Sequence, residues 1–216
     1  MKILLASADI EEVRWAATRG LADGVATTPA LLSGHDEREA LAGICRAVSL
    51  PVYATVGAVS EHDVYKEGRE LAKLSDQITV QVPLVEDAVA AIYRLSTEGI
   101  RVAATLVFSP AQALLAAKAG ASAVSLQMQQ LEALGQDGAG VLAEVRAVLD
   151  GAKAECEVIA ELPNGAARLD ACALAGADGV TVTPRDLRAL LVHPLTDRGL
   201  DQLLHDLSRR PRARTN

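Results

Sequence analysis

The chain is poor in aromatic residues and short of positive charge. Among its 216 residues there are one tryptophan, three tyrosines and one phenylalanine, too few for a platform on which nucleic-acid bases stack. It has 21 lysine and arginine residues against 28 aspartate and glutamate residues, with a formal net charge of −7. Nucleic acids and anionic membranes both bind basic surfaces. We therefore expect neither of them as a partner.

Cysteine is also scarce, and long hydrophobic runs are absent. Cys45, Cys156 and Cys172 are far apart and form no CxxC pair, a pattern typical of reduced thiols buried in a core. No apolar run reaches the roughly 18 residues of a membrane span. The first residues, MKILLASADIEE, turn acidic after a short apolar stretch, unlike a signal peptide. We expect a cytoplasmic protein.

The positions of the histidines and serines favour neither a metal site nor a nucleophilic centre. The four histidines have no metal-ligand spacing to one another, to cysteine or to carboxylates; they are His35, His62, His193 and His205. Ser7 and Ser109 show no histidine partner that would make either one a nucleophile. We therefore expect no metal and no cofactor.

Short apolar runs alternate with helical segments along the whole chain. We expect eight strands, over residues 2–6, 24–27, 51–56, 77–82, 101–106, 123–126, 157–161 and 179–182. Such alternation requires a parallel sheet, and eight units in this length are typical of a (β/α)8 TIM barrel. A doubly wound open sheet is the alternative, but it normally has a GxGxxG turn after the first strand. The first turn here, Ala6 to Asp9, contains no glycine.

We expect residues 1–208 to form one barrel domain that carries an additional C-terminal helix. Residues 196–208 are amphipathic, with four leucines on one face: Leu200, Leu203, Leu204 and Leu207. Two uses are open for this helix, docking on a neighbouring subunit or packing across the barrel end. The segment 209–216, with four arginines and one proline, is expected to be a frayed, solvated tail.

The active site of a TIM barrel lies at the carboxyl ends of its strands. Polar, almost uncharged side chains are predicted there, and the candidate ligand contacts are Ser7, Thr28, Thr55, Gln81, Thr105 and Gln127. Alternation along the fourth strand places Thr79 and Gln81 inside the barrel. A buried amide needs hydrogen bonds. For Gln81 these come either from Thr55, Thr105 or water, or from a ligand.

Glu161 is the only carboxylate among these strand ends. A half-buried carboxylate at a barrel mouth can act as a general acid or base. The alternation of the seventh strand allows either Glu161 or Leu162 to face inward. Helix capping or full solvation is therefore the alternative role for this side chain.

Several motifs resemble those of small transaldolases and fructose-6-phosphate aldolases. The signature TLVFS stands at 105–109 and is followed by AQALLAAKAGA at 111–121. DGVATTP at 23–29, ALAGAD at 173–178 and HPLTDRG at 193–199 also resemble the family, so the likeness covers nearly the whole chain. The resemblance implies a (β/α)8 barrel. It also implies class I aldolase chemistry, in which a strand-borne lysine forms a Schiff base with a ketose carbonyl.

The functional positions depart from the family pattern. The resemblance places the family's Schiff-base lysine, from its VKxP motif, at Gln81, and an amide nitrogen forms no imine. The aspartate of the first strand falls on Ala6 and the asparagine of TTNP falls on Thr28. The arginine that holds the sugar phosphate falls on Gln130, a further candidate ligand contact. The phosphate segment after the seventh strand falls on residues 162–164.

Three functional hypotheses follow. In the first, a transaldolase-like pseudoenzyme without Schiff-base chemistry binds a small polar ligand, an uncharged sugar or polyol or a carbonyl compound. In the second, Glu161 performs acid/base chemistry while Thr28, Gln81 and Gln127 orient a carbonyl substrate. In the third, an active carbohydrate aldolase or transaldolase uses a relocated lysine. The resemblance further implies a homo-oligomer, a ring of five subunits or a pair of such rings.

Overall fold

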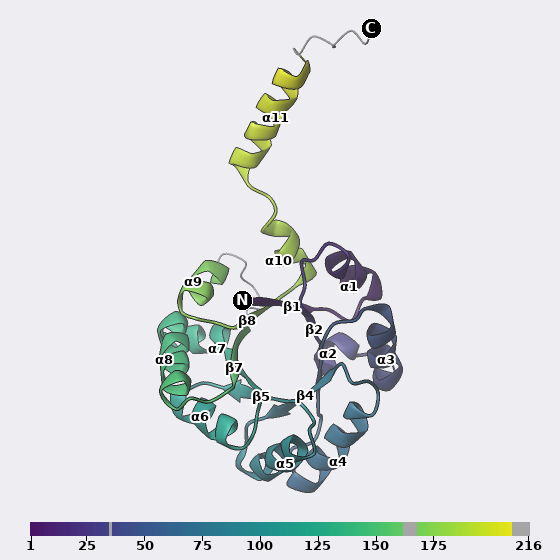
Figure 1. Ribbon diagram of the computed structural model, residues 1–216, viewed down its shortest axis with the longest axis vertical. Coiled ribbons are helices and arrows are strands. Elements are labelled where there is room, and N and C mark those ends of the chain that lie inside the picture. The colour runs from purple at the N-terminus through teal and green to yellow at the C-terminus, as the bar shows by residue number, and fades with distance from the viewer. Residues whose placement is uncertain (35, 162–167, 209–216) are drawn as a thin grey trace.

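Eight parallel strands close into one barrel in chain order (Figure 1). The computed structural model describes residues 1–34, 36–161 and 168–208. The final strand pairs with the first, so no edge is left open, and the predicted TIM barrel is confirmed over the open sheet. The strands are β1 (Lys2–Ala6), β2 (Gly24–Ala26), β3 (Val52–Thr55), β4 (Ile78–Pro83), β5 (Val102–Val107), β6 (Ala123–Gln127), β7 (Glu157–Glu161) and β8 (Gly179–Val182).

Helices surround the strand ring on its outer side (Figure 1). The helices that follow the eight strands in turn are α1 (Ile10–Ala17), α3 (Glu37–Ala47), α4 (Glu61–Ala72), α5 (Glu86–Thr97), α6 (Pro110–Lys118), α8 (Gly138–Gly151), α9 (Leu169–Leu174) and α10 (Pro184–Ala189). Two further helices, α2 (Pro29–Leu32) and α7 (Met128–Ala133), were not predicted. With four residues, α2 is too short to show a helical period, and α7 begins directly after β6 without a capping side chain.

Local sequence signals begin and end these helices. The Ser60 hydroxyl accepts a hydrogen bond from the Asp63 backbone N–H at 3.3 Å, and so caps α4. Ser109 caps α6, which has Pro110 at its first position. Gly120 and Gly176, which follow α6 and α9, have φ angles of +92° and +89°. Glycine adopts this left-handed conformation without steric strain.

Two separate apolar clusters form the core. The larger one lies between strands and helices and contains a valine from almost every strand. The smaller one consists of Leu4, Ala26, Tyr53, Ala103, Ala123 and Ile159. These six residues come from six strands and fill the barrel interior. Because side chains alternate along a strand, this cluster identifies which other strand residues face inward.

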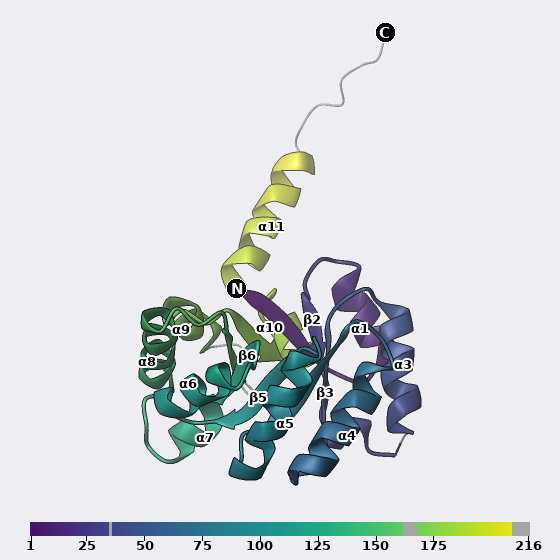
Figure 2. The same ribbon diagram turned by 60° about the horizontal axis from the view of Figure 1, so that its bottom comes forward.

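The last helix, α11 (Pro194–Ser208), projects away from the barrel (Figure 2). None of its residues is buried, and its leucine stripe is about half exposed, with 54% at both Leu203 and Leu204. The predicted amphipathic helix is therefore confirmed, but packing across the barrel end is wrong. The predicted tail, 209–216, lies outside the described residues. No helix in the described part of the chain is long and apolar enough to span a membrane.

Candidate functional site

The barrel brings five of the predicted side chains together at the carboxyl end of its inner face. Strand pairing sets Thr55 beside Gln81, Pro83 beside Thr105 and Gln127 beside Glu161. Gln81 and Thr105 are buried, with 6% and 8% of their surface exposed. Thr55, Gln127 and Glu161 are half-buried. The strand ends β3 to β7 thus present a polar inner surface at the barrel mouth.

Gln81 is held by its neighbour on β3. The Thr55 hydroxyl donates a hydrogen bond to Gln81 Oε1 at 3.0 Å, which confirms one of the predicted structural partners. The two amide N–H groups of Gln81 form no hydrogen bond within residues 1–34, 36–161 and 168–208, and neither does the Thr105 hydroxyl. Buried polar groups normally find partners. Within the described part of the chain, these groups are therefore available to water or a ligand.

Glu161 faces the barrel interior. It lies two residues after Ile159 of the inner cluster, and Gln127 Nε2 donates a hydrogen bond to Glu161 Oε2 at 2.6 Å. A bond to a charged acceptor is stronger than a neutral one, so the amide fixes the orientation of the carboxylate. The other carboxylate oxygen has no hydrogen-bond partner among the described residues. The competing residue, Leu162, lies outside them.

A bulge at the end of β5 exposes an apolar side chain, which strand alternation did not predict. The pairing with β6 shifts register between Ala104 and Val107. Leu106, within the bulge, has a φ of +57° and is 41% exposed. Positive φ is an outlier for a bulky residue and occurs most often at functional sites. Simple alternation along β5 would have turned Leu106 toward the helices. No residue type in this part of the sequence indicates a bulge.

Three predicted ligand contacts lie on the segments that follow strands rather than on the strands themselves. The Ser7 hydroxyl accepts a hydrogen bond from the Asp9 backbone N–H at 3.1 Å. Ser7 lines a cavity of about 590 Å³ with Ile10 of α1 and Leu31 of α2. The Thr28 hydroxyl caps α2, and Gln130 is exposed on α7. Binding roles for these three residues stay predictions. Residues 162–164, which the resemblance aligns with a phosphate segment, lie outside the described residues.

All five lysines of the chain are described, and none lies at the carboxyl end of a strand. Lys2 begins β1, Lys66 lies in α4, Lys73 caps α4, Lys118 ends α6 and Lys153 follows α8. The described part of the chain also holds no group of three histidine, cysteine or acidic side chains placed to bind a metal ion.

Comparison with known proteins gives a family for this geometry. The family model described as Transaldolase/Fructose-6-phosphate aldolase matches residues 3–214. A protein from Hyphomonas neptunium named "Probable transaldolase" is 40% identical over 208 residues, which cover 95% of this chain and 96% of that protein. A protein of the same name from Parvibaculum lavamentivorans is 42% identical over 209 residues, with the same coverage.

A solved structure is similar in fold. Orotidine 5'-monophosphate decarboxylase from Methanocaldococcus jannaschii, complexed with the inhibitor BMP, superposes with a TM-score of 0.64. The two chains are 16% identical, and the superposition covers 84% of this chain and 88% of the other. At this identity the likeness concerns the barrel alone. From the family match and its full-length relatives, the chain belongs to the transaldolase/fructose-6-phosphate aldolase family.

Proposed function

We propose that the barrel mouth binds a small, uncharged polyol, sugar or carbonyl compound and forms no Schiff base with it. The observation that carries the proposal is Gln81. It lies on the inner face, in the position where the sequence resemblance places the family's lysine, and its amide N–H groups have no described partner. A glutamine amide cannot attack a carbonyl, because its nitrogen lone pair is delocalised.

The chemistry of the mouth favours hydroxyl groups over phosphate. Gln81 supplies two donors, the Thr105 hydroxyl is both donor and acceptor, and Glu161 supplies an acceptor. No lysine, arginine or histidine stands on the described inner strand ends, whereas Glu161 carries a negative charge there. A phosphate dianion would be repelled and left without a counter-charge. The hydroxyl groups of an uncharged polyol can form hydrogen bonds with both the donors and the acceptors of the mouth.

One alternative reaction has a specific observation in its favour. The 2.6 Å hydrogen bond from Gln127 aims the Glu161 carboxylate into the mouth, where it is positioned for acid/base chemistry on a carbonyl ligand. If Glu161 acts in this way, Glu161→Gln abolishes turnover of a carbonyl substrate and leaves the melting temperature nearly unchanged. A relocated Schiff-base lysine is less well supported, because all five lysines lie away from the mouth.

A thermal-unfolding titration with polyols and dihydroxyacetone tests the binding proposal. A ligand at 100 times its Kd stabilises the protein by about 2.7 kcal/mol. At about 2–4 °C per kcal/mol for a chain of this size, the melting temperature rises by roughly 5–10 °C. Polyols also stabilise proteins non-specifically, but that effect does not saturate.

Matched variants separate the two effects. Gln81→Leu and Thr105→Val are expected to lose the saturable rise. Gln136→Leu, at an exposed loop position, keeps it. A saturable rise that survives in Gln81→Leu would contradict the proposal, as would a larger rise with fructose 6-phosphate than with any uncharged ligand.

We also propose that the functional unit is a cytoplasmic homo-oligomer, a pentamer or decamer. The support is α11, whose leucine stripe has no cover within the described chain, since exposed apolar patches of this kind mark interaction sites. The three free cysteines agree with a reducing compartment. Light scattering during size-exclusion chromatography is expected to show the oligomer. A truncated chain that ends at residue 193, and so lacks α11, is expected to form an assembly of fewer subunits.

A further inference from the structure

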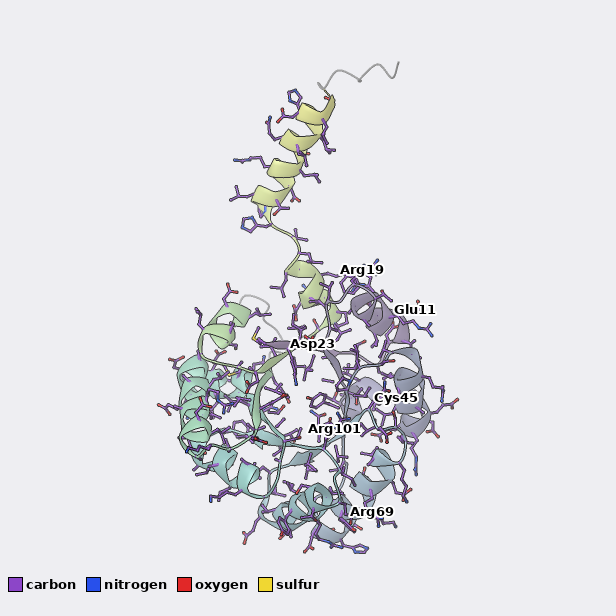
Figure 3. All side chains as sticks on the ribbon, in the orientation of Figure 1. Glu11, Arg19, Asp23, Cys45, Arg69 and Arg101 are labelled. Carbon is purple, nitrogen blue, oxygen red and sulfur yellow. The ribbon has the colours of Figure 1, made fainter. Side chains whose placement is uncertain are left out.

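A second polar cavity lies at the opposite, amino end of the barrel. It has a volume of about 150 Å³, and its lining includes Lys2, Tyr53, Thr79, Arg101 and Glu157. Lys2 and Glu157 are the first residues of β1 and β7, and Arg101 immediately precedes β5. Figure 3 shows Arg101 at the strand ring rather than among the outer helices. The cavity is therefore distinct from the mouth formed by the strand ends.

Two largely buried residues line this cavity with hydroxyl groups. Tyr53 and Thr79 are paired across β3 and β4, and only 6% and 4% of their surfaces are exposed. Neither hydroxyl forms a hydrogen bond with any residue that the structure describes. Burial, with the charge of Glu157 as a smaller cause, raises the pKa of Tyr53 to about 12. The phenol therefore stays protonated and able to donate.

The charges around the cavity leave one cation uncompensated. Lys2 Nζ lies 2.5 Å from Glu157 Oε1, so these two charges neutralise each other. Arg101 donates a hydrogen bond to the Asp76 backbone carbonyl but has no carboxylate partner in the described chain. A guanidinium has five N–H donors and binds carboxylates through two parallel hydrogen bonds. One singly charged anion would complete the site.

The volume of the cavity, about 150 Å³, has room for a short anion. Liquid water occupies about 30 Å³ per molecule, so the cavity holds the equivalent of about five waters. We propose that it binds a short 2-hydroxycarboxylate of about six non-hydrogen atoms. The carboxylate would pair with Arg101, and the ligand hydroxyl would pair with the hydroxyls of Tyr53 and Thr79. The binding uses no residue of the mouth and is independent of the function proposed above.

Saturation-transfer NMR with lactate tests this site, with propionate as the probe that lacks the hydroxyl. Lactate is expected to give a saturable signal, and propionate to bind several-fold more weakly. Arg101→Gln is expected to weaken lactate binding by about tenfold or more, because it removes the bidentate partner. Thr79→Val, which keeps the shape of the side chain, also weakens it. Gln136→Leu, at an exposed loop position, is the control and leaves lactate binding unchanged.

Three results would overturn the proposal: no saturable lactate signal, an affinity unaffected by both Arg101→Gln and Thr79→Val, or equal binding of propionate. Circular dichroism of each variant establishes that its barrel is folded. Because the two sites share no residue, polyol binding at the mouth and lactate binding at the amino end succeed or fail separately.

Discussion

Replacing Gln81 by lysine puts an amine where the sequence resemblance places the Schiff-base residue. The new side chain would occupy an inner position that is only 6% exposed. It would also lose the 3.0 Å hydrogen bond that Gln81 Oε1 accepts from Thr55. Gln81→Lys is therefore expected to cost stability and to introduce reactivity at the same time.

The stability cost follows from these two changes. Loss of the hydrogen bond costs about 1 kcal/mol. Burial lowers the pKa of a lysine, and a decrease of roughly three units from 10.4 costs about 4 kcal/mol at neutral pH. The sum, about 5 kcal/mol, is a large part of the 5–15 kcal/mol typical of a folded protein. The melting temperature is expected to fall by about 10–20 °C.

The same decrease in pKa makes the amine nucleophilic near neutral pH. In Gln81→Lys, borohydride with dihydroxyacetone is expected to trap one adduct at position 81, measured by intact and peptide mass. Aldol turnover stays low, because Ala6 and Gln130 replace groups that the family pattern uses. Gln136→Lys, at an exposed position, is the control and gives no adduct. Strong aldol turnover from Gln81→Lys alone would refute this account of the other substitutions.

Three further predictions concern the barrel interior. Thr55→Val leaves the Gln81 carbonyl unpaired and is expected to lower the free energy of unfolding in urea by about 1–3 kcal/mol. Burial raises the pKa of Tyr53 to about 12, whereas the pKa of an unfolded tyrosine is about 10. The stability that the protonated Tyr53 contributes is therefore complete below pH 10 and is lost between roughly pH 10 and 12. The melting temperature is expected to fall over that range, and to fall less steeply in Tyr53→Phe. Gly24→Ala would place a methyl group 2.7 Å from Leu4 Cδ2 and 3.2 Å from a backbone oxygen, and is expected to cost about 1–3 kcal/mol in urea denaturation.

Each of these has its own control or counter-result. Gly151→Ala, in α8 with open space around the added methyl group, is expected to stabilise the protein by up to about 1 kcal/mol. An equal loss in Gly24→Ala and Gly151→Ala would contradict the packing argument. If the melting temperature of Tyr53→Phe falls above pH 10 as steeply as that of the unmodified protein, groups other than Tyr53 cause the loss of stability. No change in Thr55→Val would mean that water replaces the hydroxyl.

The barrel was predictable because its signals are periodic and repeated. Each strand was predicted to within a residue or two of its observed bounds. β5 continues past the predicted end at Leu106 to Val107, since a bulge has no periodic signal. α2 was not predicted because four residues contain too little of a helical period. α7 was not predicted because it begins directly after β6 and has no capping side chain.

The site was predictable only in part, because alternation does not identify which set of strand residues faces inward. Gln81 had polar Thr79 on the same face, which indicated the interior correctly. The sequence did not show whether Glu161 or Leu162 faces inward; the inner position of Ile159 and the hydrogen bond from Gln127 show that Glu161 does. Ser7 was grouped with the strand ends, although it follows β1 and lines a cavity with residues of α1 and α2.

Borohydride trapping of the unmodified protein is the most direct test of the central claim, that the mouth binds without imine formation. The protein is incubated with dihydroxyacetone or fructose 6-phosphate and treated with borohydride, and its intact mass is measured by mass spectrometry. Gln81→Lys is the positive control. We predict no adduct on the unmodified chain, with its fold verified by circular dichroism. A single ligand-sized mass increment on any of the five lysines would contradict the account and identify the protein as a Schiff-base enzyme.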